Sequence, residues 1–207
     1  SNAGTGSAVV AVSGGRYEGL GVDIATTGAG AYGAAAYGAG EINLHDGSVQ
    51  TSGQAAHGLV ADGSGSVAEA ANTEISIAGS RAYGANASNG GQVNLEGVTI
   101  NQSNLSAYGR GVSATGTGSS VAAHNTEIII SGTGTNGSDA PVGAVATRGA
   151  SVVLENSTIS MIGSNRSYGV RADSGGSMTL NGVQVSTIGT NSHAVLAWAA
   201  TSGDTVG

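Results

Sequence analysis

Short stretches in which apolar and polar residues alternate recur along the chain, separated by Gly, Asn and Asp. One unit reads Tyr-Gly-Val-Arg-Ala from Tyr168, then Met-Thr-Leu from Met178, then Val-Gln-Val from Val183. Alternation over a few residues between turn formers is typical of strands with one buried face. The pattern therefore predicts three short strands per unit, and it has no helical period.

The unit repeats about every 25 residues, which is typical of stacked repeat architectures. Aligned on a Tyr-Gly or His-Gly pair or its variant, the units start at positions 32, 57, 83, 108, 142, 168 and 193. Such short strands are unstable alone, but they are stabilised when the next unit stacks on them and pairs in parallel at about 4.8 Å. We therefore predict an all-β parallel β-helix (a solenoid) of about eight coils, with three short strands per coil.

Two sets of equivalent positions recur from unit to unit, and we call each set a column. The first is an inward ladder ten residues after most starts, and it consists of Ile42, Val67, Val93, Val152 and Met178, with Val121 three residues late. The second is a corner where Gly, Asn or Asp recurs because the backbone there needs a positive φ. We place Asp46, Gly97, Asn125, Asn156 and Gly182 in that corner.

The amino-acid composition argues against several kinds of site and partner. The chain of 207 residues has no Cys, which excludes disulfides and Cys-ligated metals. A net charge of −7 with 6 Lys and Arg in total argues against nucleic-acid binding. No apolar run is long enough for a membrane-spanning helix. We expect no cofactor and no resident metal, and no residue set that we would assign as catalytic.

The chain resembles the passenger domains of bacterial type V (pertactin-like) autotransporters, whose Gly/Ser/Thr/Asn/Ala-rich coils read like Ser167 to Leu180. The resemblance implies a right-handed parallel β-helix. It also implies secretion, a tether to an outer-membrane β-barrel missing from this chain, and a place on the bacterial surface or in the medium. Residues 1–3 are expected to be an expression-tag scar, and 4–207 one rod cut from a longer passenger domain.

One polar column contains residues that are candidates for a metal site. The register puts Glu96, His124 and Glu155 above one another on successive coils, between His45 and Ala70 on one side and Asn181 on the other. A His between two carboxylates could hold a metal ion weakly. The alternative is an ordinary outward column in which opposite charges alternate along the ladder, and we favour it.

Aromatic residues occupy the starting position of most units. These residues are Tyr32, His57, Tyr83, Tyr108, Tyr168 and His193. They predict either a stripe that binds glycan or protein, or a structural stack along one edge with the hydroxyls at the rim, and we favour the stack.

The spacing between the units at 108 and 142 is the main irregularity. Its surplus residues fall around Arg110 and in the segment 132–139. Insertions in solenoids protrude as loops and often carry binding, although neutral insertions are also tolerated. The candidate binding residues are Arg110, Thr133, Thr135, Asn136, Ser138 and Asp139.

Together these features predict a non-enzymatic rod that acts as an adhesin or self-association scaffold. Its partner would be a host surface or matrix protein, a glycan, or another copy of itself. One alternative is a β-helical polysaccharide lyase or hydrolase, which would need clustered carboxylates, whereas the acidic residues here are spread over the coils. The other alternative is an inert structural stalk.

Overall fold

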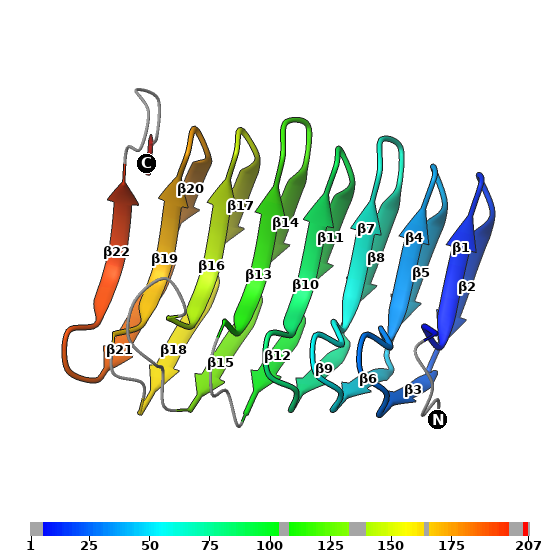
Figure 1. Cartoon of the computed structure of the whole chain (residues 1–207), viewed down its shortest axis with the longest axis horizontal. Coiled ribbons are helices and arrows are strands. Elements are labelled where there is room, and N and C mark those ends of the chain that lie inside the picture. The colour runs from blue at the N-terminus through cyan, green and yellow to red at the C-terminus, as the bar shows by residue number, and fades with distance from the viewer. Residues whose placement is uncertain (1–5, 104–107, 133–139, 164–165, 199–204, 207) are drawn as a thin grey trace.

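The fold is an all-β rod, seen from the side in Figure 1. The computed structural model describes residues 6–103, 108–132, 140–163, 166–198 and 205–206. These residues form 23 strands and no helix, and the strands belong to three parallel sheets. The chain winds as a right-handed parallel β-helix of about 7 turns, with about 26 residues per turn. The predicted fold class is therefore confirmed.

Each turn visits the three sheets in the same order. Sheet I contains β1 (Val9–Val12), β4 (Ala34–Tyr37), β7 (Leu59–Asp62), β10 (Tyr83–Ser88), β13 (Arg110–Thr115), β16 (Val142–Thr147), β19 (Tyr168–Asp173) and β22 (His193–Trp198). Sheet II contains β2 (Arg16–Leu20), β5 (Glu41–His45), β8 (Val67–Ala71), β11 (Gln92–Glu96), β14 (Ser120–His124), β17 (Ser151–Glu155), β20 (Ser177–Asn181) and β23 (Thr205–Val206). Sheet III contains β3 (Asp23–Thr26), β6 (Ser48–Thr51), β9 (Glu74–Ile77), β12 (Thr99–Gln102), β15 (Glu127–Ser131), β18 (Thr158–Ile162) and β21 (Gln184–Ile188).

The number of turns is slightly smaller than the sequence register predicts. Sheets I and II have eight described strands, but sheet III has seven. The final coil continues from β22 to the two-residue β23 without a described third strand. The rod therefore completes about 7 turns where we predicted about eight.

Inward side chains form continuous ladders along the rod. Sheet III contributes Ile24, Val49, Ile75, Ile100, Ile128 and Ile159, which pair one above another and are at most 5% exposed. Sheet I contributes a ladder of small residues, Ala11, Ala36, Ala61, Ala87, Ala114, Ala146 and Ala172. The small alanines leave room inside the coil for the large side chains of the sheet III ladder. The narrow interior can therefore be filled without Phe.

One predicted member of the sheet II ladder is wrong. Ala68, not Val67, pairs with Ile42 and Val93 on the neighbouring coils and is completely buried. Four residues, 63–66, separate β7 from β8, whereas three residues, 38–40, separate β4 from β5. The longer turn is closed by Ser66, whose N donates to Gly63 O and whose hydroxyl donates to Asp62 O. The following strand therefore starts one position later, and the equivalent of His45 is Ala71 rather than Ala70.

The corner between sheets II and III has the left-handed backbone that the sequence predicts. Asp46, Asn125 and Asn156 have φ values of 56°, 50° and 48°, and Gly97 and Gly182 have 62° and 64°. Asn and Asp tolerate this region because their short polar side chains bond locally. Here they bond to the neighbouring coil, since Asn125 Nδ2 donates to Glu96 Oε1 at 2.7 Å.

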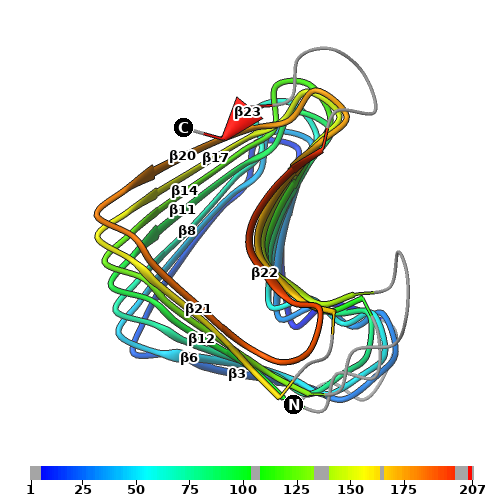
Figure 2. The same cartoon turned by 90° about the vertical axis from the view of Figure 1, so that its left-hand side faces the viewer.

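Sheet I differs from the other two sheets because its strands curve toward the interior of the coil (Figure 2). Its outer surface is therefore concave, and its floor is buried although it faces outward. Ala35, Val60 and Val145 lie on that floor at 0%, 3% and 0% exposure. The concave outer face of sheet I is the surface on which the candidate site lies.

A glycine column fixes how closely the coils approach each other. Gly33, Gly58, Gly84, Gly111, Gly143 and Gly169 follow the first position of the unit. At Gly111 a Cβ atom would lie 2.3 Å from Ile128 Cγ2 and 2.4 Å from the carbonyl oxygen of Gly143. Since the second neighbour is backbone, a side chain would force the two coils apart.

We expect Gly111→Ala to lower the free energy of unfolding by about 1–3 kcal/mol, the usual cost of overpacking. Gly21→Asn is the matched control, because Gly21 has a φ of 62°, a Cβ there would meet no atom within 4 Å, and Asn125 stands at the equivalent corner position. Urea unfolding followed by circular dichroism measures both. Equal stability of the two variants would contradict the packing role of this column.

Candidate functional site

The aromatic residues at one edge of the concave face form a stack. The rings of Tyr32 and His57 lie 4.9 Å apart at 11°, and those of His57 and Tyr83 lie 4.3 Å apart at 7°. Tyr168 and His193 stack at 5.8 Å in the last two coils. Since the ring faces cover each other, they are not open platforms for a sugar, and the geometry is that of the structural stack.

Tyr108 is not part of this stack, so its predicted place is wrong. In the register of sheet I, Tyr83 pairs with Arg110, which pairs with Val142 and then Tyr168. The unit begins two residues later than its Tyr-Gly pair suggests. Tyr108 lies instead in the turn before β13 with a φ of 57°, and the guanidinium of Arg81 lies 5.0 Å from its ring centre.

Arg110 is also placed differently from our prediction. It opens strand β13 instead of belonging to a protruding loop. Its guanidinium lies 4.9 Å above the centre of the Tyr83 ring, and its Nη1 donates to the Ser113 hydroxyl at 3.0 Å. Arg110 therefore continues the aromatic stack as a cation on the concave face.

A hollow of about 430 Å³ lies beside Arg110 on this face. We call it the arginine hollow, and its lining consists of Tyr83, Asn86, Arg110, Thr115, Thr147, Arg148, Arg171, Asp173 and Ser174. The Nε atom of Arg171 lies 2.8 Å from Asp173 Oδ2, and the two side chains are only 17% and 12% exposed. The Thr147 hydroxyl donates to the other oxygen of Asp173. The one carboxylate in the lining is thus already bound by two neighbours.

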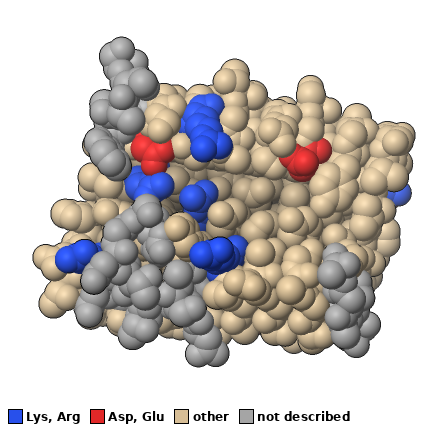
Figure 3. All heavy atoms as spheres, viewed as in Figure 1, with Lys and Arg blue, Asp and Glu red and all other residues tan. Residues whose placement is uncertain are grey.

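Charge is separated between the faces of the rod. Sheet I carries Arg110 and Arg171, and the corners beside it carry Arg81, Arg148 and Arg166. Figure 3 shows basic side chains gathered on the face of sheet I, with few acidic ones. Most described acidic residues lie on sheets II and III or at their common corner, namely Glu18, Asp23, Glu41, Asp46, Glu69, Glu74, Glu96, Glu127 and Glu155. A chain with a net charge of −7 therefore has one basic face.

The structure brings the predicted polar column of sheet II together. Glu96 pairs with His124, which pairs with Glu155, and His124 Nδ1 lies 3.1 Å from Glu155 Oε2. The two side chains are 40% and 38% exposed, and an exposed pair of this kind contributes at most about 1 kcal/mol. The Glu96 carboxylate accepts a hydrogen bond from Asn125 Nδ2. The geometry is that of an exposed column of side chains joined by hydrogen bonds and an ion pair between neighbouring coils.

The remaining predicted binding residues cannot be placed. Thr133, Thr135, Asn136, Ser138 and Asp139 lie outside the described residues. Their binding role remains a prediction.

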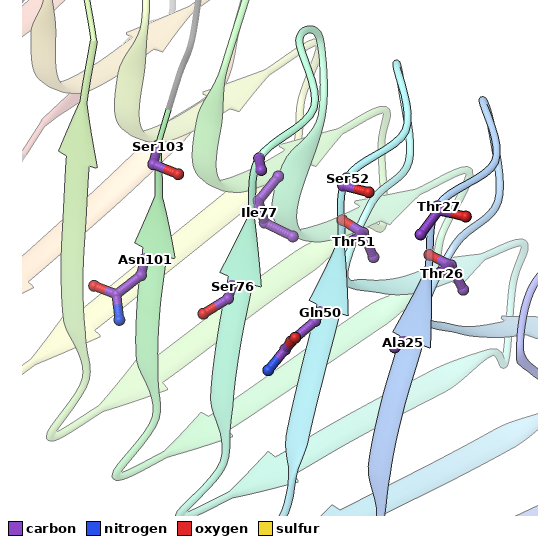
Figure 4. Close-up of a pocket in the computed structure, with 11 residues that line it drawn as sticks. Ala25, Thr26, Thr27, Gln50, Thr51, Ser52, Ser76, Ile77, Asn101 and Ser103 are labelled. Carbon is purple, nitrogen blue, oxygen red and sulfur yellow. The ribbon is translucent and has the colours of Figure 1, made fainter. Parts of the chain in front are cut away.

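A second hollow lies at the outer edge of sheet III, in the coils nearest the N-terminus (Figure 4). Gln50, Ser76 and Asn101 follow one another in register along it. Its described lining contains small, apolar and neutral polar residues and, among them, no charged side chain. It offers hydrogen bonds without a charge preference, in contrast to the arginine hollow.

Our sequence reasoning missed Asn86, Arg148 and Arg171. A signal was present in sheet I, where the strands read Ala34-Ala35-Ala36 or Leu59-Val60-Ala61 and do not alternate. Continuous apolar runs indicate strands that are buried on both faces. A polar residue in the middle of such a run, such as Asn86 or Arg171, then lies on the floor of a covered outer face.

Comparison with known proteins returns no relative of this chain. No family model, no curated protein and no solved structure matches it. Within the described ranges, no three His, Asp or Glu side chains lie close enough together to hold a metal ion. No helix long and apolar enough to cross a bilayer occurs in the same ranges.

The His57 side chain in the stack is neutral above about pH 4 when the protein is folded. Burial, followed by the nearby charge of Arg110, lowers its pKa from 6.5 to about 4. Its Nδ1 accepts a hydrogen bond from the Tyr83 amide at 3.0 Å, which a protonated ring could not accept. Between pH 6.5 and 4 the unfolded chain therefore binds a proton at His57 that the folded chain does not.

We expect this difference to lower the free energy of unfolding by about 1–3 kcal/mol as the pH falls from about 7 to about 4.5. His57→Tyr, which copies Tyr32 and Tyr83, removes that part of the pH dependence. The measurement is urea unfolding of both proteins at the two ends of that pH range. An identical loss of stability in the two proteins would show that His57 is not the group responsible.

Proposed function

We propose that the chain is a binding segment of a bacterial autotransporter passenger, exposed on the cell surface or secreted. It acts as an adhesin through the concave outer face of sheet I and does not catalyse a reaction. The observation that carries the proposal is the collection of basic side chains on this face of a chain whose net charge is −7. Long-range attraction steers partners of opposite charge toward such a face.

The rod architecture supports binding over an extended surface. The coils repeat the concave face along the axis, so that a long partner can contact several coils at once. Each contact is weak alone, but contacts on a rigid scaffold add without further ordering cost. The carboxylate of the arginine hollow, Asp173, is paired with Arg171, which favours a binding role for the hollow over the paired carboxylates that glycoside cleavage needs.

The proposal is tested by covering one face at a time. The chain has no Cys, so a single introduced Cys can carry a polyethylene glycol maleimide. Thr115→Cys labels the arginine hollow, while Thr179→Cys and Ser186→Cys label the outer faces of sheets II and III. Binding to an array of immobilised matrix proteins and glycans is the measurement.

We expect label at Thr115→Cys to abolish binding, and label at the two control positions to leave it within about a factor of two, because only sheet I makes the contact. Equal loss at all three positions would contradict a dedicated face. If the unlabelled rod bound nothing on the array, it would be an inert stalk, and if it released sugar fragments it would be an enzyme.

Self-association is a second candidate function, favoured by the neutral hollow on sheet III. Gln50, Ser76 and Asn101 lie in register along its lining, and a second copy can form hydrogen bonds with their side chains. Analytical ultracentrifugation over a range of concentrations checks this candidate. A dimer that Ser76→Arg disrupts is the expected result, and a monomer at all concentrations would exclude it.

A further inference from the structure

The arginine hollow contains more positive charge than its own residues neutralise. Asp173 forms its ion pair with Arg171. Arg110 and Arg148 form no ion pair with any carboxylate in the part of the chain that the structure describes. The hollow therefore holds a surplus of two cations over anions. An anion that entered it would relieve the mutual repulsion of these guanidiniums.

The surroundings of Arg110 increase its affinity for an anion. Burial is the main reason that the pKa of Arg110 lies below its ordinary value; the charges of Arg171 and Arg148 also lower it, while Asp173 acts in the opposite direction. A partly desolvated guanidinium binds an anion more strongly than one in water does. Arg110 is also held in place, by the Tyr83 ring and the Ser113 hydroxyl. Little side-chain entropy remains to be lost on binding.

Asn86 supplies a second and independent requirement. Asn86 lies on the floor of the concave face and is 9% exposed, and its buried Oδ1 atom has no hydrogen-bond partner among the residues that the structure describes. A buried acceptor left unsatisfied destabilises the protein, so this atom favours a ligand that brings a donor. A bare carboxylate or sulfate has no donor to offer. The ligand that suits this hollow combines an anionic group with a hydrogen-bond donor.

Uronic acid sugars combine these two groups on one ring. We propose that the arginine hollow binds an acidic polysaccharide, with its carboxylates on Arg110 and Arg148 and a sugar hydroxyl donating to Asn86. The proposal rests on the proposed function, since it names the partner of the same face. Thr115 and Ser174 line the hollow and offer further hydroxyls to the ring.

A polysaccharide fits this face better than an acidic peptide does. Peptides commonly bind to a sheet by adding a strand to a free edge. The strands of sheet I run across the rod, and each internal strand is paired on both sides, so the concave face offers no such edge. A sugar chain needs no backbone pairing, and it can lie along the axis of the rod.

The repeat supplies substitutions that other coils already tolerate. Arg148→Asn copies Asn89, which has a similar φ of 52° at the equivalent corner. Asn86→Val copies Val60 and Val145 in the same column. Arg16→Gln copies Gln92 on sheet II and is the control, because it removes the same charge from a different face.

Isothermal titration with polygalacturonate oligomers tests the proposal. We expect Arg148→Asn and Asn86→Val each to weaken binding about tenfold or more, the usual effect of losing a hydrogen bond to a charged or buried group, and Arg16→Gln to bind like the parent. Asn86→Val should also be at least as stable as the parent in urea, because it removes an unsatisfied buried oxygen. That stability separates a lost contact from misfolding.

Two matched polymers complete the experiment. Fully methyl-esterified polygalacturonate keeps the sugar but has no charge, and poly-glutamate keeps the charge but has no sugar. The proposal requires that neither binds with comparable affinity. Equal binding of poly-glutamate would overturn the choice of a sugar, and equal binding of the ester would overturn the role of the arginines.

The failure of this proposal can be told apart from failure of the proposed function. If polygalacturonate does not bind but label at Thr115→Cys still blocks adhesion to another partner, the acidic sugar is wrong and the binding face remains. If polygalacturonate binds and this label has no effect, both the hollow and the face are wrong.

Discussion

Parallel backbone pairing between successive coils is the interaction on which the rest of this protein depends. Every internal strand bonds to the strand one coil before and one coil after it, so that equivalent residues lie directly above one another. A residue can therefore be inserted only at a corner, since an insertion within a strand would turn its inward side chains outward. The close approach that this pairing demands also explains the glycine column beside the aromatic stack.

The sequence predicts the features that this constraint repeats in every coil. The inward ladder of sheet II, apart from Val67, and the left-handed corner at Asn125 and Asn156 could be located because their spacing hardly varies. The predictions fail where a corner changes length. The extra residue before β8 misplaced Val67, and the two residues before β13 misplaced Tyr108 and Arg110. Corner lengths are tolerant of change, so periodicity alone cannot fix them.

The concave shape of this face could not be predicted from the repeat for a different reason. Its curvature is a property of the whole sheet, and the arginines reach it from different columns: Arg110 from the stack, Arg148 from a corner and Arg171 from the floor. No single column contains a basic motif. The sequence therefore shows six scattered cations, while the fold gathers most of them on one side.

This arrangement separates stability from binding. The ladders of Ala and Ile inside the coil hold the rod together, and the outer column of sheet I is free to vary between Val60, Asn86, Ser113 and Arg171. Because the floor of the concave face is covered, polar residues there are partly desolvated, and their hydrogen bonds and charges have more effect than on an open surface. Binding chemistry can thus change from coil to coil without a change of fold.

The central claim is that the rod binds its partner through the concave face of sheet I, and the side-chain Nε–H signals of its six arginines test this claim most directly. In a nuclear magnetic resonance titration with polygalacturonate oligomers, the signals of Arg110, Arg148 and Arg171 should shift together and saturate, while that of Arg16 on sheet II stays unchanged. Shifts of equal size at Arg16, or no shift at the three arginines of the hollow, would contradict the account.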